Sequence, residues 1–112
     1  AQDIERARRW YAEKLGLSPL REEAQGLLYA TGGSQFFLYQ TATAGTAQNT
    51  VAEWDVDDLE AVMADLRGRG VVFEEYDYPD FKTVNAIATL GNDRAAWFKD
   101  SEGNFIALSQ RG

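Results

Sequence analysis

The chain contains nearly the same eight-residue pattern twice, and this repeat constrains its fold more than any other feature. Residues 33–40 read GSQFFLYQ, and residues 103–110 read GNFIALSQ. A helix-like segment precedes each copy, and the two segments open with the similar triplets DIE at 3–5 and DLE at 58–60. A repeat of this length indicates two copies of one supersecondary unit.

Hydrophobic spacing predicts two helices and a series of strands. One helix is expected from about Asp3 to Leu15 and another from Asp57 or Asp58 to Gly70, because apolar residues recur at helical spacing behind an aspartate that can cap the first turn. Strands are expected at 18–23, 27–31, 35–41, 50–56, 71–76, 84–90, 94–99 and 105–110, with turns at 25–26 and 32–33. The pattern therefore predicts a single α+β domain over 1–112, with a first module (1–41), a polar linker (42–49) and a second module (50–112).

The two modules are expected to differ where they begin. A strand at 50–56 opens the second module, whereas only Ala1 and Gln2 precede the first helix. A matching first strand is therefore expected upstream of residue 1, because without it the first sheet has an open edge.

Composition narrows the range of partners. The formal net charge is -7 and no run of Lys or Arg stands out, so neither nucleic acid nor a membrane is an expected partner. The chain contains neither Cys nor His, which removes thiolate nucleophiles, the commonest metal ligand and the commonest general base. No apolar run is long enough to cross a membrane, and a cytoplasmic location is expected.

The order of strand, helix and strands in duplicate resembles that of the vicinal oxygen chelate superfamily, which includes glyoxalases, bleomycin-resistance proteins, fosfomycin-resistance enzymes and extradiol dioxygenases. The similar segments are DIERARRWY at 3–11, LGL at 15–17, VDDLE at 56–60 and AWFKDSEGN at 96–104. This resemblance implies two paired βαβββ modules that enclose a cavity. In metal-dependent members of the superfamily, His, Glu or Gln side chains on the first and last strands hold a divalent ion there.

Carried over onto this chain, the ligand positions of that superfamily fall on Phe37, Val51 and Ala107, and a fourth falls on the expected upstream strand. None of these three side chains has a donor atom, whereas a transition metal needs three or four protein ligands. The resemblance therefore points to the metal-free, ligand-binding members, and no cofactor is expected.

Strand alternation predicts which side chains line the cavity. The expected ligand-binding residues are Phe37, Tyr39, Val51, Glu53, Trp97, Phe105, Ala107 and Ser109. Alternation leaves open which face Trp97 takes. In an alternative interpretation, Phe37, Tyr39 and Phe105 fill the concave face as core. Glu53 has its own alternative interpretation, as a solvated carboxylate at the mouth of the cavity or as a partner for an arginine.

Two further segments have alternative interpretations. Residues 74–82, EEYDYPDFK, are either a lid that lays aromatic rings over a ligand or an exposed loop anchored by its aromatic residues. Arg6, Arg8 and Arg9 are expected on the solvated face of the first helix, with Trp10 covering a seam between modules or subunits.

No catalytic constellation is expected, because Ser109 has no histidine to activate it. The leading hypothesis is a metal-independent protein that binds a small, partly aromatic or cationic molecule, and the protein is expected to be a homodimer. One alternative is a metal-dependent lyase or dioxygenase of the same superfamily with non-standard ligands. Another alternative is a structural module with a filled cavity.

Overall fold

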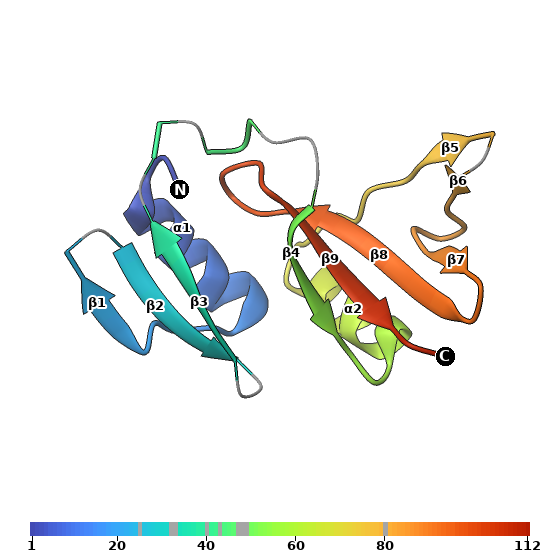
Figure 1. Cartoon of the computed structure of the whole chain (residues 1–112), viewed down its shortest axis with the longest axis horizontal. Helices are drawn as coiled ribbons and strands as arrows, with labels where there is room; N and C mark the ends of the chain where they lie inside the picture. The colour runs from blue at the N-terminus through green and yellow to red at the C-terminus, as the bar shows by residue number, and fades with distance from the viewer. Residues whose placement is uncertain (25, 32–33, 40, 43, 47–49, 80) are drawn as a thin grey trace.

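The computed structural model describes residues 1–24, 26–31, 34–39, 41–42, 44–46, 50–79 and 81–112, and Figure 1 shows the arrangement of their helices and strands. The elements of the first half are α1 (Ile4–Trp10), η1 (Tyr11–Leu15), β1 (Arg21–Glu23), β2 (Gly26–Thr31) and β3 (Ser34–Tyr39). Those of the second half are β4 (Thr50–Asp55), α2 (Leu59–Gly68), β5 (Asp77–Tyr78), β6 (Phe81–Lys82), β7 (Ala88–Leu90), β8 (Asp93–Lys99) and β9 (Phe105–Gln110). No helix among these described residues is long and apolar enough to cross a membrane.

Both main helices begin at the aspartates that the sequence indicates. The side chain of Asp3 accepts a hydrogen bond from the Arg6 amide, and that of Asp58 accepts one from the Ala61 amide. The first helix continues from α1 into η1, which is a turn of π-helix, and it ends at Gly16. Gly16 has a φ of 68°, a left-handed conformation that suits glycine at a helix end.

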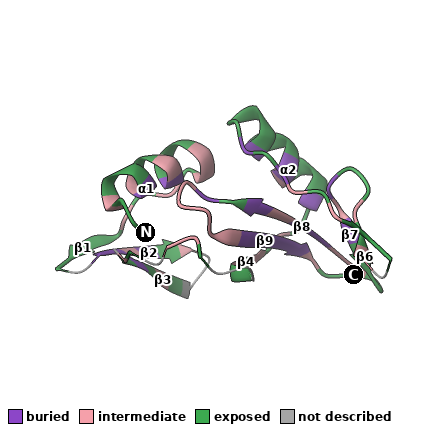
Figure 2. Ribbon diagram, turned by 90° about the horizontal axis from the view of Figure 1, so that it is seen from above, coloured by how far each residue is buried: buried purple, intermediate pink, exposed green. Residues whose placement is uncertain are grey.

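The strands form two main sheets that lie side by side (Figure 1). Antiparallel pairing joins the first sheet in the order β1-β2-β3, and the second sheet has the order β4-β9-β8-β7, in which β4 runs parallel to β9. A separate small hairpin pairs β5 with β6. Each main helix covers one face of its own sheet, and both helices lie on the same side of the molecule (Figure 2). We call the opposite side of each sheet its open face.

Buried residues from both halves form one hydrophobic cluster. Two aromatic contacts join the halves directly: Trp10 stacks on Phe98 with ring centroids 6.1 Å apart, and Phe36 meets Trp54 edge to face at 5.7 Å. Trp10 therefore covers the seam between the halves, which is one of the two roles expected for it.

Two predicted strands are largely wrong. Segment 71–76 makes only an isolated bridge, between Phe73 and Phe98, and 84–90 is a strand only from Ala88. Both segments run along the outer edge of β8, where tertiary contacts rather than local pattern decide the pairing. The Gly32-Gly33 turn and residues 25, 40, 43, 47–49 and 80 lie outside the described residues.

The sequence repeat is matched by equivalent backbone hydrogen bonds at the ends of β3 and β9. The Val56 amide donates to the Ser109 carbonyl at the end of β9, and the Ala1 amine donates in the same way to the Tyr39 carbonyl at the end of β3. The Thr41 amide also donates to the Ala1 carbonyl at 2.7 Å. Ala1 therefore occupies, beside β3, the place that Val56 occupies beside β9. The strand expected upstream of Ala1 stays a prediction.

Candidate functional site

A pocket of about 730 Å³ lies between the two halves, and we call it the interhelix pocket. Its walls come from the end of the first helix, from β2 and β3, from β4 and from α2. The lining residues are Leu15, Leu17, Thr31, Gln35, Phe36, Ala52, Glu53, Trp54, Asp55, Val56, Val62, Leu66, Phe98 and Leu108. A pocket of this volume with mainly apolar walls and a few polar groups is typical of small-molecule sites.

A second pocket of about 420 Å³ lies beside it, and we call it the N-terminal pocket. It is lined by Ala1, Tyr11, Phe36, Phe37, Leu38, Tyr39, Thr41, Ala44, Gly45, Thr46, Val51, Ala52, Trp54, Asn104 and Ile106. Phe36, Ala52 and Trp54 line both pockets, so the edge-to-face ring pair stands between them. A hydrogen bond from the Trp54 indole to the Thr31 hydroxyl, 3.2 Å long, fixes this wall.

Glu53 and Asp55 are acidic residues at the edge of the interhelix pocket. They pair with Ala107 and Ser109 on β9, so their side chains project toward the open face of the second sheet, and the two carboxylates differ in their partners. Asp55 accepts a hydrogen bond from Arg111 at 3.4 Å. No ion pair or hydrogen bond to the Glu53 side chain is found within the described part of the chain, and the residue is exposed. Glu53 is therefore a solvated carboxylate, as its alternative interpretation expected, and its negative charge is available to a ligand at the edge of the pocket.

The expected site residues divide into three groups rather than lining one cavity. Phe37, Tyr39 and Val51 line the N-terminal pocket, whereas Glu53 lines the interhelix pocket. The remaining four, Trp97, Phe105, Ala107 and Ser109, line neither pocket and lie on the open face of the second sheet.

The orientation of Trp97 is settled by its register. Trp97 pairs with Ala107 on β9, while its neighbours Ala96 and Phe98 are fully buried in the core. Trp97 therefore shares the open face with Ala107. Ala107 and Ser109 are only 2% and 5% exposed, so neither offers much surface to a ligand.

The alternation expected along β4 fails at Val51. The register with β9 shifts between Thr50 and Ala52, so Val51 is an extra residue at a β-bulge. Thr50 instead lies opposite Phe105, and its hydroxyl accepts a hydrogen bond from the Trp97 indole at 3.2 Å.

The aromatic residues of the 74–82 segment serve as anchors. Tyr76 and Phe81 both meet the Trp97 ring edge to face, with centroids 5.8 and 5.4 Å apart. Tyr78 is 59% exposed. This packing favours the anchored loop over the lid, although Asp80 lies outside the described residues.

The interpretation of Phe37 and Tyr39 as core is wrong. Their side chains are 43% and 53% exposed, and their rings stack on each other with centroids 6.4 Å apart. Phe105 is half-buried and carries the Lys99 ammonium over its ring at 5.0 Å.

The side chains at the superfamily's ligand positions do not fit a metal ion. Phe37, Val51 and Ala107 carry only hydrocarbon, and no group of three or more acidic residues in the described ranges is arranged to hold an ion.

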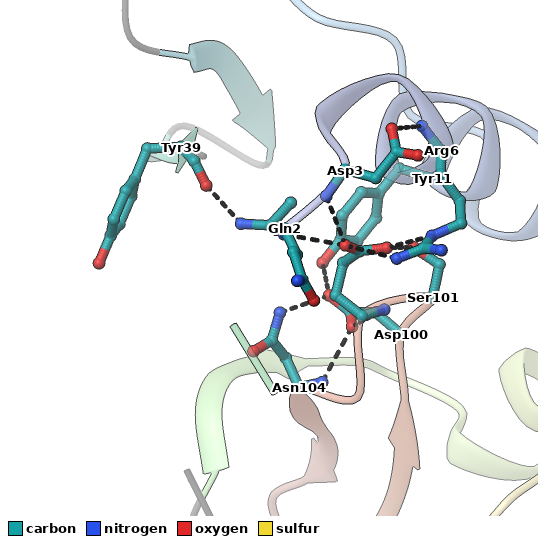
Figure 3. A network of polar contacts seen from close by, with 10 residues as sticks. Gln2, Asp3, Arg6, Tyr11, Tyr39, Asp100, Ser101 and Asn104 are labelled. Carbon is teal, nitrogen blue, oxygen red and sulfur yellow. Dashed lines mark hydrogen bonds and ion pairs between the residues drawn. The ribbon is translucent and has the colours of Figure 1, made fainter. Parts of the chain in front are cut away.

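A polar cluster next to the N-terminal pocket joins the two halves, and we call it the clamp (Figure 3). The Glu102 carboxylate, whose side chain is fully buried, accepts hydrogen bonds from the amides of Gln2 and Asp3 and from the guanidinium of Arg6. Asp100, which is 6% exposed, accepts hydrogen bonds from the Tyr11 hydroxyl at 2.6 Å and from Asn104. The first half thus supplies donors, and the turn between β8 and β9 supplies acceptors.

The clamp shifts the acidity of its members. Hydrogen bonding to Arg6 lowers the pKa of Glu102 from 4.5 to about 2. Burial and the nearby Asp100 carboxylate raise the pKa of Tyr11. Gly45 packs against this turn with a φ of 72°, and a Cβ atom there would meet the Glu102 carbonyl oxygen at 2.0 Å. Glycine is therefore required at this close approach.

Sequence reasoning missed both the clamp and the apolar wall of the interhelix pocket. Arg6 lies on an exposed face of the first helix as predicted, and its guanidinium additionally reaches the Glu102 carboxylate, 96 residues away. Leu15, Val62 and Leu66 read as ordinary core positions, and their helical spacing gives no sign that they also line a pocket.

Comparisons with known proteins identify the fold. No protein-family model and no curated protein sequence matches the chain, whereas many solved structures do. One is TnmS3, an antibiotic-binding protein from Streptomyces sp. CB03234, at 26% identity and a TM-score of 0.69 over 98% of this chain and 88% of that one. Another is a glyoxalase/bleomycin resistance protein/dioxygenase from Alicyclobacillus acidocaldarius, at 14% identity and a TM-score of 0.72 over 99% and 85%. A third is a lactoylglutathione lyase from Agrobacterium tumefaciens, at 13% identity and a TM-score of 0.67 over 98% and 86%.

The chain therefore has the α+β glyoxalase/bleomycin-resistance fold, and its resemblance to the vicinal oxygen chelate superfamily is confirmed at the level of the fold. The names of these three structures describe a binding protein, a family of mixed activities and a lyase. One fold hosts all of them, so function has to be argued from the site.

Proposed function

We propose that this chain binds a small cation with an aromatic or apolar body in the interhelix pocket, without a bound metal. The observation that carries the proposal is a pocket of about 730 Å³ with two aromatic walls, Phe36 and Trp54, beside the exposed carboxylate of Glu53, which has no partner among the described residues. An aromatic wall favours a planar or cationic ligand, and a carboxylate without a partner favours positive charge.

Two further observations support a binding role. The net charge of -7 favours the approach of cations. One structural neighbour is described as an antibiotic-binding protein, which is the kind of activity that such a pocket suits.

The experiment that tests the proposal follows Trp54 by ¹⁹F NMR in protein labelled with 5-fluorotryptophan. The chain has three tryptophans, so replacing each by Phe assigns its resonance. The probe is N-methylquinolinium, with 2-naphthol as a neutral and 2-naphthoate as an anionic comparison. We expect the cation to shift the Trp54 resonance saturably and to bind more tightly than the other two. A saturable shift confined to Trp97 would instead place the site on the open face of the second sheet.

Glu53→Gln is the matched test of charge. Loss of one exposed carboxylate is expected to weaken N-methylquinolinium binding by about twofold to fivefold. Glu13→Gln, at an exposed position of η1 outside the pocket, removes the same charge and should leave binding unchanged. Equal weakening by both variants would show that only the net charge matters.

Metal independence has its own measurement. Binding should be the same in protein treated with a chelator and after addition of zinc, manganese or nickel. Tighter binding with one equivalent of any of these ions would favour the metal-dependent alternative.

We also propose that the protein is a homodimer. Phe37, Tyr39 and Val51 expose large apolar surfaces close together, and such patches mark interaction sites. Sedimentation velocity should give the mass of a dimer for the wild type and of a monomer for Tyr39→Asp. A monomer for the wild type over the whole concentration range would contradict the proposal.

A further inference from the structure

A separate pocket of about 820 Å³ lies on the outer side of α2, and we call it the outer pocket. It is lined by Glu60, Met63, Arg67, Glu75, Lys82, Val84, Asn85, Ile87, Thr89 and Arg94. None of these residues lines the interhelix pocket or the N-terminal pocket.

Helix α2 separates the outer pocket from the interhelix pocket. Glu60, Met63 and Arg67 are spaced i, i+3 and i+7 and line the outer pocket. Val62 and Leu66 are spaced i and i+4 and line the interhelix pocket. The 3.6-residue period of the helix therefore gives each pocket its own stripe of side chains.

Most charged groups of the outer pocket already have partners. Arg94 donates to Glu60 at 2.6 Å and to the Gln110 side chain at 3.1 Å. One Glu75 oxygen accepts hydrogen bonds from the Thr83 hydroxyl at 2.6 Å and the Ala86 amide at 3.0 Å. These two carboxylates are committed to the protein, so they are poor candidates for holding a cation.

Arg67 differs from the other positively charged groups of the outer pocket in that it has no acidic partner among the described residues. Its guanidinium makes one long hydrogen bond, of 3.4 Å, to the Asn85 carbonyl and lies 5.2 Å from the centre of the Phe73 ring. No acidic side chain of the described residues forms an ion pair with Arg67. Arginine carries five donors in a planar fork that matches a carboxylate or a phosphate, and most of these donors are unused here.

The turn that contacts Arg67 is held rigidly. Val84 and Ile87 exchange two backbone hydrogen bonds around Asn85 and Ala86, whose φ angles are 53° and 68°. Left-handed conformations at two successive residues define a tight hairpin turn in which glycine is usual at the second position. The surrounding bonds therefore keep an unfavourable turn in place, as is common at ligand sites.

We propose that the outer pocket binds a small organic anion, with its carboxylate or phosphate group on Arg67 and its apolar part against Val84 and Ile87. Lys82 adds positive charge at the rim, where its ion pair with the exposed Asp77 is long, at 3.7 Å. The ligand chemistry follows from Arg67, because an anion would supply the acidic partner that its guanidinium does not find among the described residues. This site is independent of the proposed function in the interhelix pocket.

Met63 provides a selective probe, because it is the chain's only methionine and is 1% exposed on the pocket floor. Protein labelled with [¹³C-methyl]methionine therefore gives one methyl resonance. Benzoate and phenyl phosphate are the test anions, and benzylamine is the cationic comparison. We expect a saturable shift of the Met63 resonance with at least one anion and none with benzylamine. The anion that binds more tightly distinguishes a carboxylate from a phosphate site.

Variants of Arg67 test the role of its side chain. Arg67→Gln should weaken anion binding by about tenfold, and Arg67→Lys by less, because lysine keeps the charge and loses the fork. Arg69→Gln is the matched control, because Arg69 lies on the same helix, pairs with Asp65 at 3.3 Å and does not line the pocket. It should bind the anion as the wild type does.

Two results would overturn the proposal. One is the absence of a saturable Met63 shift with either anion in wild-type protein. The other is equal anion affinity in Arg67→Gln and Arg69→Gln. Because the Trp54 resonance reports on the interhelix pocket, failure at one pocket is distinguishable from failure at the other.

Discussion

The two halves use the same strand pattern but expose it differently. Phe37 and Tyr39 on β3 occupy the repeat positions of Ala107 and Ser109 on β9. The first pair is 43% and 53% exposed, whereas the second pair is 2% and 5% exposed. The difference follows from the neighbours: β9 lies between β4 and β8, while β3 has β2 on one side and, within the described chain, only Ala1 bonded to its other side. Burial at a repeat position is thus set by the flanking strands rather than by the pattern itself.

The halves also differ in what they contribute to their junction. The first half contributes donors to the clamp, from Gln2, Asp3, Arg6 and Tyr11, and the second contributes the carboxylates of Asp100 and Glu102. Such a one-way arrangement is sensitive to changes on the acceptor side, because one buried carboxylate there serves several donors.

Glu102→Gln is expected to have the largest effect. The amide keeps one acceptor oxygen but turns an NH₂ group toward the Arg6 guanidinium, so several charge-assisted bonds are lost and two donors face each other. We expect the free energy of unfolding to fall by about 2–3 kcal/mol. Urea denaturation measures this loss, with Glu13→Gln as a control that should change stability by less than about 0.5 kcal/mol. Similar stability of both variants would show that the clamp does not hold the halves together.

The stabilisation by Glu102 also depends on pH with a definite sign. Its pKa is lowered from 4.5 to about 2 in the folded state, so the contribution is fully present above pH 4.5 and is lost as the pH falls toward 2. The stability difference between the wild type and Glu102→Gln should therefore be constant at neutral pH and shrink between about pH 4.5 and pH 2. A difference that stays constant down to pH 2 would mean that the Glu102 charge is not responsible.

Exchanging residues at a repeat position tests the role of the flanking strands. Ala107→Phe places the residue of the first half into the second sheet, where the small side chain is covered and Trp97 lies opposite. We expect a loss of about 1–3 kcal/mol from overpacking. The reverse change, Phe37→Ala, removes a ring that is 43% exposed and should cost less than about 1 kcal/mol. Equal costs in thermal unfolding would indicate that the two positions have the same surroundings.

The sequence correctly predicts those elements whose hydrophobic pattern is set by the residues within the element itself. The final strand is found at Phe105–Gln110 as expected, and both helices begin at the predicted aspartate caps. The apolar period of 2 or 3.6 residues depends only on which face is buried, so it can be read without tertiary information. The prediction of a strand at 71–76 is wrong, because a single bridge, from Phe73 to Phe98, forms there instead.

The candidate site was less predictable than the fold. Alternation predicts that Glu53 points away from the core face, and its pairing with Ala107 agrees, but the bulge at Val51 interrupts the same alternation two residues earlier. The bulge inserts one residue and shifts the register, which no local pattern in the sequence announces. The bond from Arg6 to Glu102 spans 96 residues, and only the packed arrangement of the two halves brings these side chains together.

Two tyrosines of the first half lie side by side and are expected to respond differently when their hydroxyl groups are removed. The rings of Tyr11 and Tyr29 have centroids 5.8 Å apart, and both side chains are buried. The Tyr11 hydroxyl donates to Asp100 across the junction, whereas the Tyr29 hydroxyl is buried with no hydrogen-bond partner among the described residues. Tyr11→Phe should therefore cost about 1–2 kcal/mol, because it removes a bond to a buried carboxylate.

Tyr29→Phe should be neutral or stabilise the protein by up to about 1 kcal/mol, because it removes a polar group whose burial is not compensated. The stacking of this ring on Phe36, at 4.8 Å, is retained in the variant. Thermal unfolding of the two variants at pH 7 measures the difference, and the two mutations can be compared directly because each deletes one hydroxyl from the same aromatic cluster. If Tyr29→Phe cost as much as Tyr11→Phe, its hydroxyl would have to be paired through a bound water molecule. The contrast between a bond across the junction and an unpaired group within the first half would then disappear.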